Sequence, residues 1–356
     1  MSLAHPQPSP KPSARRNLVG ERDAEAARSR SGGYDDRRMP RPLFVDADPG
    51  IGDALAVTAA LLDPELDLIG LAGTAGQFDA ETATTNLQSV LALLDPPKWP
   101  RLGQGPADRF APPVDGYPDA KLIHGESGLG DFAGYDVEPA DRIDAAKLLI
   151  ELVRDHPDEV TYLSLGPLST LHRAIQLHPP LVSQIGEIVI LGGWLAGGGD
   201  ATAAADFNMF ADPAAAHAVL ASPATITLVP LDVCRRVTLT LDQYDRLPID
   251  PHTRLGQLLE KLLPFLFRSH HEQLGQESIR LDELVALAAV AQRRLFETDR
   301  MVADVETDGL LTRGMVVFDR RGLSDRQPNV DVAVDVDAQG VRDYLMGLLR
   351  SSGQPR

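Results

Sequence analysis

Three acidic side chains stand within eight residues, directly after an apolar run near the start of the chain. The run Leu43-Phe44-Val45 leads into Asp46-Ala47-Asp48-Pro49-Gly50-Ile51-Gly52-Asp53. Carboxylates this close repel one another unless a cation lies among them. Oxygen-rich sites of flexible geometry suit Ca²⁺, or Mg²⁺ with more retained water, and a tight Pro-Gly turn would bring Asp48 and Asp53 onto one ion. The residues alone also allow Asp46 and Asp53 to be ordinary turn and helix-start residues.

Polar or glycine-rich residues follow several later apolar runs as well. These segments are Thr74-Ala75-Gly76-Gln77, Gly166-Pro167-Leu168-Ser169, and a loop from Gly192-Gly193 to Asp206-Phe207-Asn208. Ligands of open α/β sheets bind outside the carboxyl ends of the strands, so these residues predict an enzyme site at one sheet edge. The chain contains no GxGxxG and no GxxxxGK(S/T) pattern, which removes the common dinucleotide-binding and phosphate-loop interpretations.

The elements that must position these residues alternate along the chain from Met39 onward. Hydrophobic periodicity predicts strands over 42–47, 66–74, 160–165, 187–192, 225–233, 301–305 and 330–336. It predicts helices over 52–62, 80–94, 145–154, 168–177, 213–220, 255–276, 341–349 and after Asp282. The glycine- and proline-rich stretch 103–134 reads as a long functional loop. Strand–helix alternation predicts an α/β fold: an open, mainly parallel central sheet with helices on both faces.

Composition excludes several classes of function. The 356 residues carry a formal net charge of −17, which argues against binding to nucleic acid or to an anionic membrane surface. The single cysteine, Cys234, excludes an internal disulfide and any cysteine-based zinc site. No apolar run reaches the roughly 20 residues that a bilayer span needs. Without an apolar signal segment at the N-terminus, we expect a cytoplasmic protein whose partner is a small molecule.

The first 38 residues differ from the rest of the chain. They hold eight basic and five acidic side chains and are rich in Pro, Ser, Arg and Gly. Such a segment buries too little apolar surface to offset its ordering entropy. We expect residues 1–38 to be a disordered extension, or Met39 to be the true start. The five acids count against a targeting peptide. Residues 39–356 are expected to form a single domain.

Six short motifs, in order, resemble those of the inosine–uridine-preferring nucleoside hydrolase family. The segment from Asp46 to Asp53 resembles the family signature DxDPGxDD, and 124–130 matches its HGESGxG loop. The segments 165–169, 192–193 with 206–208, 231–233, and 305–314 resemble GPLTN, GG…EFN, LDVT and VETxGxLTRG. Together the matches extend from about Met39 to Arg350. The resemblance implies the family's open α/β fold and hydrolysis of the N-glycosidic bond of nucleosides.

The resemblance also implies a set of site residues. One Ca²⁺ per subunit would be held by Asp48, Asp53, Asp282 and the backbone carbonyl of Leu165. Asp48 would also act as the general base that takes a proton from the attacking water. The family resemblance further suggests a homodimer or homotetramer.

On the substrate side, the resemblance assigns sugar contacts to the loop that follows 192–193. Asn208 and Asp206 would form hydrogen bonds with ribose hydroxyls, although Asp206 is one methylene shorter than the usual Glu. Phe207 would form part of the pocket wall. His124, in the glycine-rich HGESG loop, would line the base pocket and could act on the leaving group.

Three positions near the expected sugar depart from the family pattern. Gly52 stands where the first acid of the DD pair normally grips a ribose hydroxyl. Gln77 stands where Asn is usual, and Asp200 where Asn contacts the 5′ side of the ribose. A pocket without its hydroxyl grip discriminates less against the analogue that lacks the hydroxyl. We therefore expect a weaker preference for ribose over deoxyribose, with Gly52→Asp restoring it, or a bulkier sugar.

A fourth departure concerns the leaving group. Leu281, preceded by Arg280, stands where many purine-active members have a His that protonates the base. The remaining candidate donors are His124 and the pair His270 and His271, although exposed helical positions suit that pair better. The departures favour pyrimidine-like or activated leaving groups.

Two alternatives remain at this point. The chain could be a catalytically weak or inactive relative that binds calcium and a sugar-like ligand, or a hydrolase with an altered sugar substrate. An Asp-x-Asp after a first strand also occurs in phosphotransferases of the haloacid-dehalogenase kind. That chemistry needs a downstream Ser or Thr, a Lys and an acidic pair, and no convincing set is present.

Overall fold

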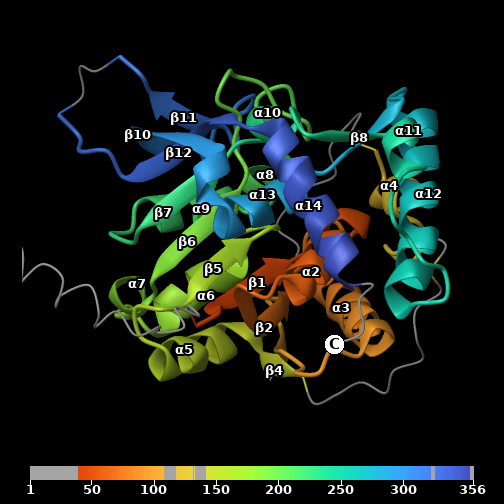
Figure 1. Ribbon diagram of the computed structural model, residues 1–356. Helices are drawn as coiled ribbons and strands as arrows, with labels where there is room; N and C mark the ends of the chain where they lie inside the picture. The colour runs from red at the N-terminus through yellow and green to blue at the C-terminus, as the bar shows by residue number, and fades with distance from the viewer. Residues whose placement is uncertain (1–38, 108–117, 131, 133–141, 322–324, 353–356) are drawn as a thin grey trace, which may run out of the picture. The chain divides into compact units, whose positions relative to one another are not determined.

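The computed structural model describes residues 39–107, 118–130, 132, 142–321 and 325–352, and their strands build one ten-stranded sheet (Figure 1). The strand order is β11-β10-β12-β7-β6-β5-β1-β2-β3-β4. Neighbours from β12 to β4 pair in parallel, whereas β10 is antiparallel to both β11 and β12. The strands are β1 (Arg41–Ala47), β2 (Leu66–Gly73), β3 (Arg101–Gln104), β4 (Ile143–Asp144), β5 (Thr161–Ser164), β6 (Glu187–Leu191), β7 (Ile226–Val229), β10 (Phe296–Val305), β11 (Val316–Asp319) and β12 (Val330–Val336). The predicted α/β class with a mainly parallel sheet is confirmed.

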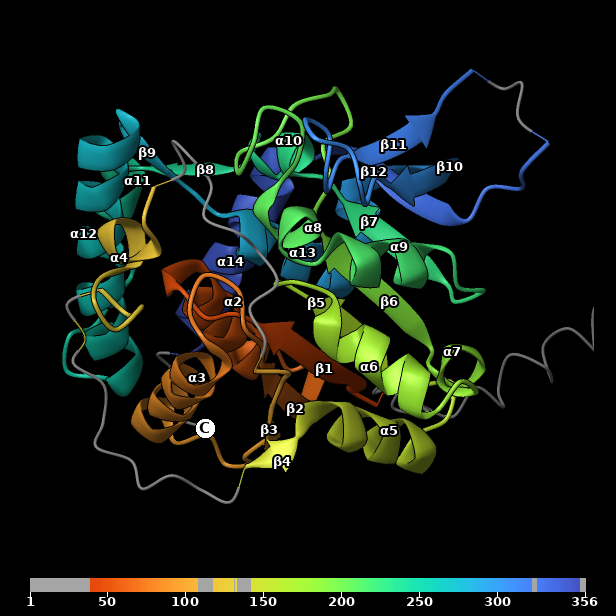
Figure 2. The same cartoon turned by 180° about the vertical axis from the view of Figure 1, so that it is seen from behind.

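Helices cover both faces of the sheet, as the front and back views show (Figures 1 and 2). On one side lie α2 (Ile51–Leu62), α3 (Ala80–Leu94), α13 (Asp282–Ala291) and α14 (Ala338–Ser352). On the other lie α5 (Ala145–Asp155), α6 (Ser169–Leu177), α7 (Leu181–Gln184) and α9 (Pro213–Leu220). The remaining helices are α4 (Ala120–His124), α8 (Phe207–Ala211), α10 (Leu231–Cys234), α11 (Leu241–Tyr244), α12 (Arg254–Leu274) and the 3₁₀ turn η1 (Arg293–Leu295).

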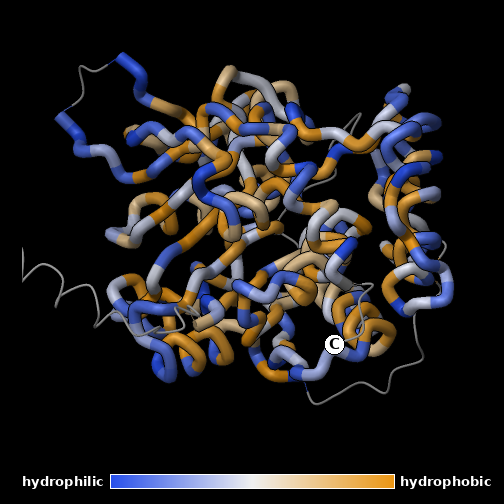
Figure 3. Tube along the Cα trace, viewed as in Figure 1, coloured by the Kyte–Doolittle hydropathy of each residue, from blue (hydrophilic) through white to orange (hydrophobic). Residues whose placement is uncertain are grey.

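Two separate apolar cores follow from this layering. Along β1, Leu43 and Val45 pack into the core on the α2 side, whereas Phe44 packs into the core on the α5 side. Successive strand residues point to opposite faces, so a strand buried on both faces needs a continuous apolar run. Figure 3 shows hydrophobic residues along the central strands accordingly. Burial on both faces explains why the sequence pattern located these strands well.

The structure corrects two predicted elements. The strand expected over 225–233 ends at Val229, because Pro230 precedes the short helix α10. The stretch 103–134, expected as a loop, contains the end of β3 and the helix α4 in its described part. A small antiparallel sheet of β8 (Thr238–Thr240) and β9 (Ser278–Arg280) was not predicted.

Contacts group Pro40–Arg356 into one unit, separate from Met1–Met39. The expectation of a disordered extension over 1–38 falls outside the described residues. Among the described helices, none is both long and apolar enough to cross a membrane.

Candidate active site

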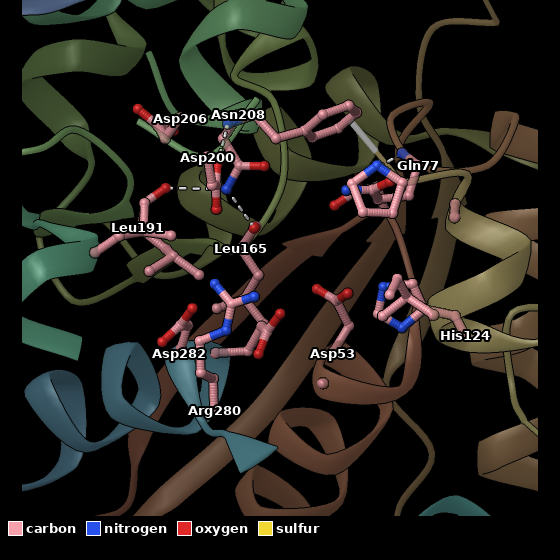
Figure 4. Close-up of a pocket in the computed structure, with 18 of the residues that line it drawn as sticks. Asp53, Gln77, His124, Leu165, Leu191, Asp200, Asp206, Asn208, Arg280 and Asp282 are labelled. Carbon is pink, nitrogen blue, oxygen red and sulfur yellow. Dashed lines mark hydrogen bonds between the residues drawn. The ribbon is translucent and has the colours of Figure 1, made fainter. Parts of the chain in front are cut away.

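A cavity of about 210 Å³ opens beyond the carboxyl ends of the central parallel strands (Figure 4). Strands β1, β2, β5 and β6 end at this edge, and the first turns of α2 and α13 also face it. The ten residues expected from the sequence to bind the cation or substrate, or to act in catalysis, all line the cavity: Asp48, Asp53, Gln77, His124, Leu165, Asp200, Asp206, Phe207, Asn208 and Asp282. Residues up to 234 positions apart therefore meet because parallel strands present their carboxyl ends at one edge.

Asp48 lies in a narrow cradle just after β1. Its carboxylate fits only because two neighbours are glycines: a Cβ at Gly76 would overlap it, and one at Gly166 would lie 2.6 Å from Oδ1. The backbone N–H of Gln77 donates to Oδ2 over 2.7 Å. Burial, and to a lesser extent the charges of Glu283 and Asp46, raise the pKa of Asp48 to about 7. A carboxylate with such a pKa is well matched to accept a proton near neutral pH.

Asp46, the other acid of the Asp-x-Asp pair, points elsewhere. It is fully buried and accepts hydrogen bonds from the hydroxyls of Thr74 and Tyr162. It does not line the cavity. Its carboxylate is engaged by these two hydroxyls, whereas Asp48 lies beyond the end of β1, so Asp46 supports the sheet edge and takes no part in the cavity wall.

Asp53 and Asp282 lie in the first turns of α2 and α13, where the helix N-terminus favours negative charge. The Gly50 N–H donates to Asp53 Oδ2 over 3.0 Å. In the described part of the chain, Asp53 Oδ1 and Asp282 Oδ1 are buried without any hydrogen-bond partner. Burial raises the pKa of Asp53 well above its usual value, and that of Asp282 to about 6 against the opposing charges of Arg280 and Arg235.

These donors fit a hard cation. The side chains offer oxygen only, and two buried oxygens lack the partner that such atoms almost always have. The Leu165 carbonyl also faces the group and accepts a hydrogen bond from Asn208 Nδ2 over 2.7 Å. Within the described ranges, no three His, Cys, Asp or Glu side chains are already grouped as a metal cage. The unpartnered oxygens are therefore the stronger indication of a cation site.

The loop between β6 and α8 forms the opposite wall. Asp206 caps α8 and accepts from Gly193 N (2.7 Å) and Met209 N (3.2 Å). Asp200 accepts from Phe207 N (3.2 Å) and pairs with Arg235 over 3.0 Å. The acids of this loop therefore hold its backbone, although both also line the cavity.

Two of the three candidate histidines reach the cavity. Ile51 N–H donates to His124 Nδ1 over 3.1 Å, so the ring carries its hydrogen on Nε2. Burial lowers the pKa of His124 to about 4, and that of His270 likewise to about 4. His270 is buried on the cavity wall, which corrects its expected exposure. His271 is exposed and pairs with Glu277 instead, so it cannot reach a leaving group.

Sequence reasoning missed one charged residue of the cavity and undervalued another. Glu283 follows Asp282 directly and lines the cavity, where burial and the charges of Asp53 and Asp282 raise its pKa to about 8. Arg280, noted only as a departure, is also on the wall. The sequence shows an extra acid, Glu283, directly after Asp282, and a glycine at position 52 where the family has an acid. Only the contact between α2 and α13 relates the two positions.

The family model described as inosine-uridine preferring nucleoside hydrolase matches residues 43–343. This chain belongs to that family. The non-specific ribonucleoside hydrolase RihC of Escherichia coli O1:K1 / APEC is 35% identical over 317 residues, which cover 87% of this chain and 99% of the relative. The RihC of Shigella boydii serotype 18 is also 35% identical, over 315 residues.

Solved structures agree with this nucleoside hydrolase assignment. The plant nucleoside hydrolase PpNRh1 is 29% identical with a TM-score of 0.79, covering 87% of this chain and 99% of the plant protein. The purine-preferring ribonucleoside hydrolase from Gardnerella vaginalis is 28% identical, also with a TM-score of 0.79, covering 87% and 98%. As a nucleoside hydrolase, the chain cleaves N-glycosidic bonds, which removes the phosphotransferase alternative.

Proposed function

We propose that this nucleoside hydrolase cleaves ribonucleosides with one bound Ca²⁺ and with Asp48 as general base. Asp48, Asp53, Asp282 and the Leu165 carbonyl would hold the ion. The observation that carries the proposal is the pair of buried, unpartnered oxygens on Asp53 and Asp282 beside the Asp48 cradle. Such oxygens cost free energy unless a ligand satisfies them.

The residues suit N-glycoside cleavage. The transition state resembles an oxocarbenium ion, with positive charge spread over the sugar. A bound cation would favour the ionised forms of the four acids on the cavity wall, Asp48, Asp53, Asp282 and Glu283. Preorganised negative charge stabilises that state. When bound, the cation would lower the pKa of a water and orient it for attack on the anomeric carbon.

Asp48 then takes the proton of the attacking water. Its Oδ2 is held by Gln77 N–H, and the bound cation would favour its ionised form, which can accept a proton. General-base assistance contributes ~10²–10⁴-fold to the rate. The two glycines around it, Gly76 and Gly166, leave the space that its carboxylate occupies.

Leaving-group assistance falls to His124. Because its pKa lies near 4, the ring is neutral at working pH and offers its Nε2 hydrogen as a hydrogen-bond donor. A neutral donor stabilises a leaving base less than an imidazolium would. We therefore expect better turnover of substrates whose base departs easily.

The experiment that tests this function is a substrate panel of inosine, uridine, cytidine and adenosine, each with Ca²⁺ and with EGTA. The names of the relatives, non-specific and purine-preferring ribonucleoside hydrolases, support the choice of ribonucleosides. Calcium-dependent release of free base supports the proposal. Calcium and ribose binding without turnover would instead identify a non-catalytic relative. A cytoplasmic location and a homodimeric or homotetrameric state remain predictions.

A further inference from the structure

Gly52 and Glu283 occupy one place in the cavity wall. Gly52 lies in the first turn of α2 with no left-handed φ, so the backbone does not require glycine there. A Cβ at this position would overlap Oε2 and Cδ of Glu283 and lie 2.6 Å from Oε1. The glycine therefore provides the space that the Glu283 carboxylate fills, and the acid absent from α2 is supplied by α13.

The Glu283 carboxylate is available to a ligand. It is half-buried, on the wall of the same cavity as Asp53 and Asp282. In the part of the chain that the structure describes, no other side chain donates a hydrogen bond to it. A carboxyl group accepts hydrogen bonds when ionised and can also donate one when protonated. A sugar hydroxyl, which both donates and accepts, can partner either form.

We propose that Glu283 is the residue that grips a ribose hydroxyl of the substrate and sets the preference for ribose over deoxyribose. This inference rests on the proposed function. It replaces the expectation from Gly52 alone of a relaxed sugar preference. The longer Glu side chain compensates for its origin on the neighbouring helix, which packs directly against α2.

The test compares kcat/KM for uridine, 2′-deoxyuridine and 3′-deoxyuridine on four proteins: wild type, Glu283→Ala, Glu283→Gln, and Gly52→Asp combined with Glu283→Ala. Loss of a charge-assisted hydrogen bond is expected to lower kcat/KM for uridine ~10- to 100-fold. The deoxynucleoside that lacks the gripped hydroxyl should change little. In the double variant, an Asp at position 52 has room and should recover part of the ribose preference.

The matched control is Glu272→Ala, an exposed acid on α12 that does not line the cavity, and it should behave as wild type. The Ca²⁺-induced rise in Tm should persist in Glu283→Ala, because Glu283 binds sugar. Unchanged kcat/KM ratios of uridine to both deoxynucleosides in Glu283→Ala would overturn the inference. So would an equal loss on all three substrates together with loss of the Ca²⁺ effect, which would make Glu283 a cation ligand.

Calorimetric titration with D-ribose and 2-deoxy-D-ribose keeps the two proposals separate. If wild type cleaves no nucleoside yet binds ribose more tightly, and Glu283→Ala loses that difference, the inference stands and the proposed hydrolytic function fails. If neither sugar binds, or the difference survives in Glu283→Ala, the inference is wrong whatever the enzyme hydrolyses.

Discussion

The acids on the two walls of the cavity differ in their hydrogen bonding. On one wall, Asp53 and Asp282 each keep a buried oxygen without a partner among the described residues. On the loop wall, Asp200 and Asp206 have every carboxylate oxygen engaged, by backbone N–H groups or by Arg235. Both pairs were equally prominent in the sequence.

This difference distinguishes acids that can bind a ligand from acids that stabilise the loop. A buried acceptor without a donor costs about 1–3 kcal/mol, a cost that a ligand can offset. Acids whose two oxygens already accept hydrogen bonds stabilise their own loop and have less to offer a substrate. We therefore expect the wall with Asp53 and Asp282 to bind the cation, and the loop wall to shape the pocket. Asn208 joins the walls, since it donates to the carbonyls of both Leu165 and Leu191.

The largest effect is expected at Asp48. Replacing it as Asp48→Asn should lower kcat by ~10²–10⁴-fold, because the amide cannot accept the proton of the attacking water, while the fold and the Tm measured without Ca²⁺ stay near wild type. Steady-state kinetics on uridine measure this. Asp67→Asn, at a residue that pairs with Lys98 and does not line the cavity, is the control. Near-wild-type activity in Asp48→Asn would show that another group takes the proton.

Cation binding should depend on the acids of one wall and not on those of the other. Ca²⁺ at 100 times its Kd should stabilise the protein by about 2.7 kcal/mol, seen as a rise in Tm. Asp53→Asn and Asp282→Asn should lose most of this rise, and EGTA should stop turnover. Asp200→Asn should keep it. A rise that depended on Asp200 and not on Asp53 would reverse the roles of the two walls.

Asp206 tests the supporting wall. Asp206→Ala removes the cap of α8 and leaves Gly193 N–H buried without its acceptor, for a loss of about 1–2 kcal/mol. Chemical denaturation should report this loss at equal size with and without Ca²⁺. If stability is unchanged and only the KM for ribonucleosides rises, Asp206 serves the sugar and not the loop.

The smallest effect is expected at His124. Because its pKa is near 4, it is neutral above that pH and contributes a neutral hydrogen bond of about 0.5–1.5 kcal/mol. His124→Phe should lower kcat/KM for inosine several-fold and leave an activated p-nitrophenyl riboside nearly unaffected. His271→Phe is the control, since that ring is exposed. An inflection near pH 6.5 that disappears in His124→Phe would show that the ring titrates at its ordinary pKa.

The fold class and the location of the site could be predicted because they depend on local sequence patterns. Continuous apolar runs mark strands buried on both faces, and alternation with helices implies a parallel sheet. Parallel strands end at one edge, so residues following β1, β2, β5 and β6 had to meet there. For that reason all ten predicted site residues line one cavity, although their individual roles were inferred from resemblance.

Only the tertiary structure decided how those residues are used. Whether an acid is free or engaged depends on backbone donors that the loop brings to it, as at Asp206. Whether His270 or His271 faces the cavity depends on the rotation of α12. Glu283 fills the space left by Gly52, although the two residues lie 231 positions apart on different helices. No local sequence pattern predicts this contact. The sequence determines which chemical groups are present. Packing between elements distant in the chain determines which groups each of them contacts.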